Sequence, residues 1–248
     1  MKKIAHRPAG LPATPSKYCP GCLHATAHKL IAEVLEEMNL EGETIVVFPV
    51  GCSVYGPWCT TFDSTVAAHG RATAVATGIK RCKPDKLVIS YQGDGDATSI
   101  GLAETIHSAN RGENITVIFI NNGIFGMTGG QMAPTTLVGQ RSTTGGSARD
   151  PEQTGYPIKM CEMLAPLPAT KYVARFSLNS VPNILKAKRG IKKAFQYQID
   201  GVGYSFIELL SNCPTNWKMK PVDTLKHIEE NVMAYYPLGE FKTTEVGK

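Results

Sequence analysis

The sequence predicts an α/β fold in which a parallel β-sheet is covered by helices on both faces. Apolar runs such as residues 45–50 and 115–120 are continuous rather than alternating, which is typical of strands buried on both sides. These runs recur between segments of helical period, the order expected of a parallel sheet. The chain has 248 residues, of which 42% are apolar, enough for one large core. We therefore expect one domain over residues 1–248, with a short Pro-rich arm at each terminus.

The expected elements alternate along the chain. In order, they are a helix over 23–38, a buried strand over 44–50, a small-residue helix over 65–81, a strand over 86–92, a helix over 97–110, a strand over 115–121, a helix over 151–164, a strand over 172–175, a helix over 181–197 and a last strand over 204–210. The Gly/Thr-rich stretch 123–146 has no helical period. A loop of that length inside a compact domain is more often functional than idle.

Charge and hydropathy exclude several classes of protein. The formal net charge is +5, and the clustered basic residues fall within one predicted helix. No aromatic residues are interleaved with them to stack on bases, so we interpret them as a solvated helix face and expect no nucleic-acid partner. These basic residues are Lys186, Lys188, Arg189, Lys192 and Lys193. No apolar stretch approaches the ~20 residues of a membrane-spanning helix, so no membrane association is expected.

The cysteine content indicates a reducing compartment. Seven cysteines, an odd number, favour thiol or metal chemistry over a disulfide framework. Lys2 and Lys3 resemble the start of a signal peptide, but prolines and glycines follow them in place of an apolar segment. We therefore expect a cytoplasmic protein.

The sharpest motif is Gly93-Asp94-Gly95-Asp96, which is followed one helix and one strand later by Asn121-Asn122. Asp94 and Asn122 then lie at the ends of two parallel strands and face one crevice, where ligands bind in such folds. Glycines on both sides of Asp94 let the backbone approach a phosphate at the start of the next helix. Either fragment alone would be interpreted as a surface turn. Together they predict a diphosphate site with Mg²⁺ held by oxygen ligands.

A second candidate site involves thiols. Cys19-Pro-Gly-Cys22 is compatible with a zinc half-site, a redox pair or two unrelated cysteines, and no second closely spaced pair follows to complete a zinc site. Cys52 comes after the first predicted strand and Cys213 after the last. Because these points share one edge of a parallel sheet with Asp94, four thiolates can converge beside the diphosphate site.

The order of motifs resembles a known family. Cys-Pro-Gly-Cys, Gly-Cys-Ser, His-Gly-Arg, Gly-Asp-Gly-Asp, Asn-Asn and a late Cys-Pro follow one another between about Tyr18 and Thr215. This order is similar to that of the β subunits of 2-oxoacid:ferredoxin oxidoreductases, and the Asp/Asn pair is similar to that of thiamine diphosphate enzymes. The chain departs from the family at Leu23, where glycine is common. The resemblance implies the diphosphate-binding module of the thiamine diphosphate-binding fold.

The resemblance also assigns residues. It implies one [4Fe-4S] cluster on Cys19, Cys22, Cys52 and Cys213, consistent with four-cysteine ligation. It implies Mg²⁺ on Asp94, Asn122 and the main-chain oxygen of Ile124. Further cofactor contacts are expected at Gly51, Cys52, Ser53, His69, Gly93, Gly95, Asp96, Gly126, Met127 and Thr128. His69 and Arg71 are catalytic candidates, and for His69 a capping or core role stays open. Cys59, Cys82 and Cys161 match no ligand position and are interpreted as structural free thiols.

The implied activity is the coenzyme A-dependent oxidative decarboxylation of a 2-oxoacid, with ferredoxin as electron acceptor. A partner α subunit would carry the glutamate that activates the cofactor's pyrimidine, and γ and ferredoxin-like subunits are also expected. Residues 54–58 are uncharged where some relatives carry lysine or arginine, which favours a branched-chain substrate such as 2-oxoisovalerate over 2-oxoglutarate. The alternatives are a subunit of a non-oxidative thiamine diphosphate-dependent decarboxylase and a zinc-binding assembly module.

Overall fold

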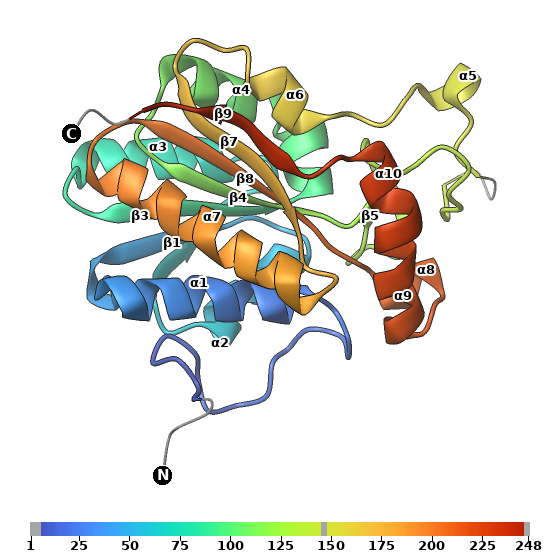
Figure 1. Ribbon diagram of the computed structural model, residues 1–248, viewed down its shortest axis with the longest axis horizontal. Coiled ribbons are helices and arrows are strands. Elements are labelled where there is room, and N and C mark those ends of the chain that lie inside the picture. Colours follow the sequence, from blue (N-terminus) through green and yellow to red (C-terminus); the bar gives the residue numbers. More distant parts are fainter. Residues whose placement is uncertain (1–5, 145–147, 246–248) are drawn as a thin grey trace.

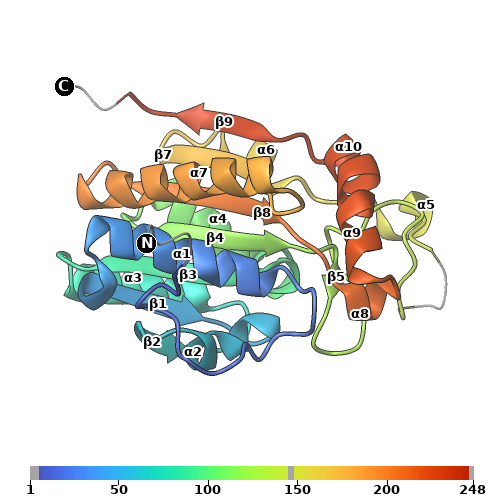
Figure 2. The ribbon, with the colours of Figure 1, turned by 60° about the horizontal axis from the view of Figure 1, so that its bottom comes forward.

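The fold is built on a seven-stranded sheet with strand order β2-β1-β3-β4-β8-β7-β9. The computed structural model describes residues 6–144 and 148–245, so Lys2, Lys3 and the end of the predicted Gly/Thr-rich loop lie outside the described residues. The strands of this sheet are β1 (Thr44–Phe48), β2 (Asp63–Val66), β3 (Leu87–Gly93), β4 (Thr116–Asn121), β7 (Thr170–Ser177), β8 (Tyr204–Leu210) and β9 (Gly239–Thr243). Among the described strands of this sheet, β9 alone is paired antiparallel, as its reversed arrow in Figure 2 shows.

Helices cover both faces of the sheet, which confirms the predicted α/β class (Figure 1). Helices α1 (His24–Met38) and α7 (Val181–Ile199) cover one face, and α3 (Ala72–Cys82), α4 (Leu102–Arg111) and α6 (Met160–Leu164) cover the other. Side chains alternate between the two resulting cores along each strand, so Val46 packs with α1 and α7 while Val47 packs with α3. Burial of both strand faces explains the continuous apolar runs.

Two predicted helices are wrong in part. The helix expected over 65–81 begins only at Ala72, because 63–66 forms the edge strand β2 beside β1. All four residues of β2 are exposed, and their sequence does not show the apolar run that marks a buried strand. The strand was therefore not predicted. The helix expected over 151–164 is two short helices, α5 (Pro151–Thr154) and α6. Gly155 ends α5 at a φ of 68°, a left-handed conformation that favours glycine.

The C-terminal segment is more regular than a Pro-rich arm. It forms α8 (Pro214–Trp217), α9 (Pro221–His227), the π-helical turn η4 (Ile228–Val232) and α10 (Met233–Tyr235), followed by β9. These helices stack at the carboxyl ends of the parallel strands (Figures 1 and 2). The other short elements are η1 (Glu41–Glu43), η2 (Cys52–Tyr55), α2 (Gly56–Cys59), the π-helical turn η3 (Asp96–Ile100) and the hairpin strands β5 (Ile124–Phe125) and β6 (Gln131–Met132).

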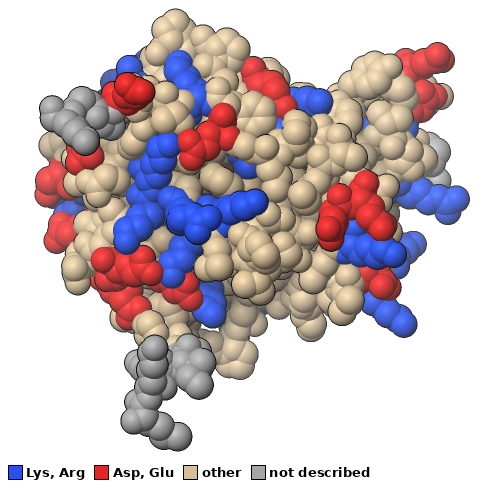
Figure 3. Space-filling model, in the orientation of Figure 1, with Lys and Arg blue, Asp and Glu red and all other residues tan. Residues whose placement is uncertain are grey.

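The predicted basic face lies on α7, where lysines and arginines gather in Figure 3. Ion pairs join several of them to acidic residues of other elements, such as Lys188 to Glu33 and Lys193 to Glu240, each at 2.8 Å. The cluster is therefore a solvated and partly neutralised helix face. Within the described residues, none of the helices is both long and apolar enough to span a membrane.

Candidate cofactor site

An open cleft lies at the carboxyl ends of β1, β3 and β4. It brings together all of the residues predicted to hold the cofactor and Mg²⁺, namely Gly51, Cys52, Ser53, His69, Gly93, Asp94, Gly95, Asp96, Asn122, Ile124, Gly126, Met127 and Thr128. His24, Val50 and Phe125 also line the cleft and were not predicted to do so. The segment after β1 starts at Gly51 with a φ of 100°, which turns the chain into η2 at a conformation that glycine adopts without strain.

Asp94 and Asn122 meet at the backbone of the next loop. β3 ends at Gly93 and β4 at Asn121, and the two strands are parallel neighbours, so the following side chains emerge at the same edge. The N–H of Ile124 donates to Oδ2 of Asp94 at 3.1 Å and to Oδ1 of Asn122 at 3.2 Å. Two predicted oxygen ligands, which are far apart in the sequence, therefore share one donor.

Further donors hold the Asp94 carboxylate. Gly95 N–H donates to Oδ1 at 2.8 Å, and the buried hydroxyl of Thr135 donates to Oδ2 at 2.7 Å. No contact was expected for Thr135, because it lies in a loop and the hydrophobic periodicity of the sequence does not predict the course of a loop. The indole N–H of Trp217 donates to the carbonyl of Asn122 at 3.1 Å and fixes the second predicted ligand from α8.

The electrostatics of Asp94 suit a cation. Burial raises the pKa of its carboxyl to about 6, although hydrogen bonds from Thr135, Gly95 and Ile124 act in the opposite direction. In the described residues, no lysine or arginine forms a salt bridge with Asp94. A buried carboxylate and an amide oxygen are hard ligands of the kind that Mg²⁺ prefers, so the residues fit this ion.

The described part of the chain contains no group of three or more histidine, cysteine, aspartate or glutamate side chains arranged to hold a single metal ion. The predicted Mg²⁺ ligands include only one such side chain, since the others are an amide and a main-chain carbonyl. Their roles as ligands stay predictions.

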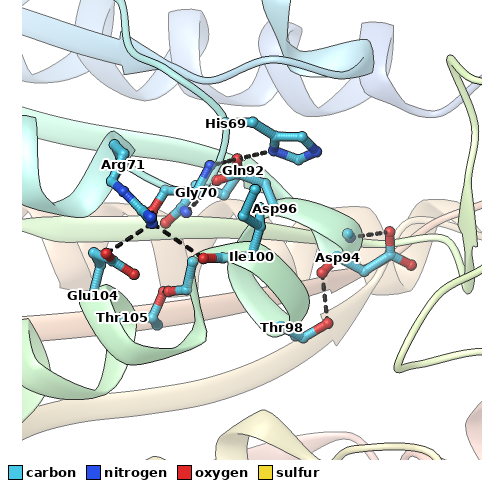
Figure 4. A network of polar contacts seen from close by, with 12 residues as sticks. His69, Gly70, Arg71, Gln92, Asp94, Asp96, Thr98, Ile100, Glu104 and Thr105 are labelled. Atoms are coloured by element: carbon cyan, nitrogen blue, oxygen red, sulfur yellow. Dashed lines mark hydrogen bonds and ion pairs between the residues drawn. The ribbon is translucent and has the colours of Figure 1, made fainter.

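His69 lines the cleft, and Figure 4 shows its ring held beside Asp96. Its Nδ1 lies 2.6 Å from Oδ1 of Asp96, and the Gly70 N–H donates to the same carboxylate oxygen. Gln92 donates to the other oxygen of Asp96. Both oxygens of Asp96 are therefore engaged by the protein, and the contacts make Asp96 an anchor for the His69 ring.

Arg71 does not line the cleft. Its guanidinium donates to the carbonyl of Ile100 at 3.1 Å and pairs with Glu104 at 2.7 Å, as Figure 4 shows. These bonds join the start of α3 to the end of η3 and to α4. In the structure, Arg71 therefore connects elements of the fold and does not reach the cleft where it was expected to act.

Thr128 lines the cleft, but its hydroxyl donates to Oε1 of Gln131.

The four cysteines predicted to hold a cluster come from three segments, with Cys19 and Cys22 before α1, Cys52 at the start of η2 and Cys213 before α8. A methyl group added at Gly126 would lie 3.1 Å from Sγ of Cys52 and 3.6 Å from Sγ of Cys213. Glycine at this position thus lets the loop around Gly126 lie directly against both sulfurs. All four cysteines are free thiols, with Cys19 exposed and Cys22 partly buried.

The four cysteines also influence one another's ionisation. Burial raises the pKa of Cys22 to about 12, and the nearby Cys213 and Cys19 thiols add to the rise. Burial raises the pKa of Cys52 to about 12 as well, with further contributions from Cys22, Cys213 and Cys19. If ionised, the four cysteines would repel one another unless a positively charged centre lay among them, and a four-cysteine set has the ligand chemistry of a [4Fe-4S] cluster.

The other three cysteines lie outside this group. Cys59 is buried near Ser16, and Cys82 is exposed at the end of α3. Cys161 is buried and its thiol donates to Glu208 at 3.2 Å. Tyr55 and Trp58, two aromatic residues of the uncharged segment 54–58 on which the expected branched-chain substrate rested, do not line the cleft. Trp58 is 57% exposed on α2.

Comparison with known proteins identifies the family. Residues 50–209 match the family "Thiamine pyrophosphate enzyme, C-terminal TPP binding domain", thiamine pyrophosphate being another name for thiamine diphosphate. The chain is 40% identical to the 2-oxoglutarate synthase subunit KorB of Methanocaldococcus jannaschii over 88% of this chain and 78% of that protein. The chain belongs to the 2-oxoacid:ferredoxin oxidoreductase subunits that carry this domain.

Two further relatives extend the comparison of this oxidoreductase subunit. It is 45% identical to the ketoisovalerate oxidoreductase subunit VorA of Methanothermobacter thermautotrophicus over 98% of this chain, but it spans only 51% of that protein's length. A solved structure of 2-oxoglutarate:ferredoxin oxidoreductase from Magnetococcus marinus, with 2-oxoglutarate, coenzyme A and succinyl-CoA bound, superposes with a TM-score of 0.81. That match covers 100% of this chain and 88% of the other at 25% identity, and it confirms the predicted fold.

Proposed function

We propose that this chain is the β subunit of a 2-oxoacid:ferredoxin oxidoreductase, binding thiamine diphosphate with Mg²⁺ and one [4Fe-4S] cluster. With its partners it would decarboxylate a 2-oxoacid oxidatively, pass the acyl group to coenzyme A and the electrons to ferredoxin. One observation carries the proposal: Gly126 lies against the sulfurs of Cys52 and Cys213 and lines the same cleft as Asp94. A cofactor held there would be next to its electron acceptor.

The chain's own residues would bind and orient the reactants. When bound, thiamine diphosphate supplies the nucleophilic carbon for the 2-oxo group, and the cluster supplies a one-electron acceptor beside it. Asp94, Asn122 and the Ile124 carbonyl would hold Mg²⁺ against the diphosphate, and the backbone N–H groups of Gly126 and Met127 would donate to it. His69, which Asp96 orients through Nδ1, would hold or donate a proton at Nε2 toward the cofactor or the substrate carboxylate.

The site would be completed by a partner subunit. Activation of the cofactor's pyrimidine needs a carboxylic acid, and among the described residues that line the cleft there is no glutamate. We propose that an α subunit supplies it, and that γ and ferredoxin-like subunits complete the complex. This chain alone should then reduce no viologen dye with a 2-oxoacid and coenzyme A, and addition of the α subunit should restore reduction. Turnover by the single chain would contradict the divided site.

The substrate we propose is a branched-chain 2-oxoacid such as 2-oxoisovalerate. The described residues that line the cleft include Val50 and Met127, both apolar, but no lysine or arginine to pair with a distal carboxylate. The ketoisovalerate relative also has the higher identity of the two named above. The alternative, 2-oxoglutarate, is favoured by the 2-oxoglutarate synthase relative and the solved oxidoreductase, and would require a cation from a partner. The ratio of kcat/KM for the two acids on the assembled complex decides between them.

The visible absorption spectrum of the anaerobically purified protein tests the cluster. A broad iron-sulfur band is expected. A colourless protein that binds thiamine diphosphate would instead support a non-oxidative decarboxylase subunit, and a colourless protein that contains zinc and binds no cofactor would support an assembly module.

A further inference from the structure

Asn216 lies between the two cofactor sites. It belongs to α8, which starts directly after Cys213, and its side chain is partly buried. Its Nδ2 donates to the carbonyl of Gly126 at 2.8 Å and to Sγ of Cys213 at 3.2 Å. One carboxamide therefore joins the loop expected to hold the diphosphate to a cysteine expected to hold the cluster.

The geometry determines which way the amide points. The Gly126 carbonyl and the Cys213 sulfur are both acceptors, so only the NH₂ end of the carboxamide, with its two protons, suits both. The opposite end packs against Gly130, where an added methyl group would lie 3.1 Å from Oδ1 of Asn216. The bond to Gly126 thus holds the amide so that its second N–H points at the sulfur.

This contact has no equivalent at the other predicted ligands. Among the described residues, no other side chain donates a hydrogen bond to Cys19, Cys22, Cys52 or Cys213. An N–H that donates to a thiolate sulfur stabilises negative charge on that sulfur, and Nδ2 of Asn216 lies 3.2 Å from Sγ of Cys213. Asn216 therefore stabilises negative charge on this sulfur.

We propose that Asn216 is a positioning residue that raises the reduction potential of the cluster by donating its side-chain N–H to Cys213. The proposal rests on the cluster assignment made above. When an external reductant transfers one electron to the cluster, negative charge on the iron and its thiolates increases. A donor fixed at one sulfur stabilises the reduced form more than the oxidised form, so it makes reduction easier.

The test is a potentiometric titration, followed by electron paramagnetic resonance, of the anaerobically purified complex with dithionite and redox mediators. Asn216→Leu removes the donor at similar side-chain size, and Thr215→Val changes an exposed neighbour on the same helix. We expect the cluster of Asn216→Leu to be reduced about tenfold less readily, a shift of about 59 mV to more negative potential for a one-electron couple. Thr215→Val should have the wild-type potential.

Controls separate this inference from the proposed function. A wild-type chain without iron would contradict the cluster assignment itself. Full iron content with an unchanged potential in Asn216→Leu would contradict the role of Asn216 alone. If Asn216→Leu loses iron, the near-isosteric Asn216→Asp, which replaces the donor by an acceptor, must show the negative shift. Loss of iron from both variants would also overturn the inference, because Asn216 would then be needed for assembly of the cluster.

Discussion

Two predicted metal sites are organised differently: the oxygen ligands around Asp94 in the cleft (the Asp94 end), and the cysteine group beside it (the cysteine end), of which Cys52 lines the cleft and Cys19, Cys22 and Cys213 do not. At the Asp94 end, hydrogen bonds from Gly95, Ile124 and Thr135 hold the carboxylate in place, and Asn122 shares the Ile124 donor. At the cysteine end, the sulfurs come from the N-terminal segment, from η2 and from the turn before α8, and burial raises the pKa of three of their thiols. The first end is ordered by the protein's own bonds, whereas the second gathers groups that repel one another when ionised.

This difference indicates how each end would respond to its metal. A preorganised oxygen site can bind and release Mg²⁺ without large rearrangement, because its ligands are held by strands and short loops. A set of thiols that resist ionisation instead needs the metal centre to become thiolates, so binding would release protons and stabilise the surrounding segments. The predictions below test this contrast, from the largest expected effect to the smallest.

Asp94→Ala should abolish Mg²⁺-dependent binding of thiamine diphosphate, because it removes the only charged ligand predicted for the ion. Isothermal titration calorimetry of the assembled complex measures this binding. Asp85→Ala, which changes an exposed aspartate before β3, is the matched control and should bind normally. Unchanged cofactor content in Asp94→Ala would remove Asp94 from the site.

Cys213→Ser should lower the iron content and slow electron transfer to ferredoxin, while thiamine diphosphate binding in the cleft persists. The reason is that serine is a poor ligand for a cluster that depends on four thiolates. Elemental analysis and ferredoxin reduction provide the measurements. Cys82→Ser, at an exposed thiol outside the group, should keep full iron. Full iron and normal electron transfer in Cys213→Ser would exclude this cysteine as a ligand.

The affinity of the Asp94 end for Mg²⁺ should depend on pH. Burial raises the pKa of the Asp94 carboxyl to about 6, and Mg²⁺ binds its ionised form. Affinity should therefore be nearly constant above pH 6 and fall about tenfold for each unit below it, since one proton then competes with the ion. Titrations of Mg²⁺ at constant thiamine diphosphate between pH 7.5 and 5 measure the slope. A constant affinity down to pH 5 would show that Asp94 stays ionised.

Thr135→Val should weaken Mg²⁺ binding by about tenfold, because a residue that holds a metal ligand typically contributes at that level. The valine has a similar shape but cannot donate to Oδ2 of Asp94. Thr135→Ser keeps the hydroxyl and should restore most of the affinity in the same titration. Equal weakening by serine and valine would show that the methyl group, rather than the hydrogen bond, matters at this position.

The strand–helix alternation and the main site motifs could be predicted from the sequence alone. Continuous apolar runs indicate strands that are buried on both faces, and Asp94 and Asn122 each follow such a run. Parallel strands place their carboxyl ends at one edge, so local pattern and topology together brought these two residues into one cleft. The same reasoning placed Cys52 and Cys213 near each other, and the structure puts both beside Gly126.

The sheet edges could not be predicted in this way. β2 is exposed along its length, and β9 is short and largely polar, so neither carries the apolar signal of a buried strand. Both exist because a neighbouring strand offers backbone hydrogen bonds. The helix predicted over 151–164 is likewise divided, because Gly155 adopts a positive φ that ends α5, and the helical periodicity of the sequence does not reveal this turn.

The sequence by itself determined the fold class, the strand ends that carry Asp94 and Asn122, and the cysteines that meet there, because each depends on patterns within one element and on the shared direction of parallel strands. Only the tertiary structure decided which donors hold them and where Arg71 points. Thr135 reaches Asp94, and Asn216 reaches both Gly126 and Cys213, across long separations in sequence. Such contacts depend on the final path of loops and on packing between distant segments, which no local period encodes.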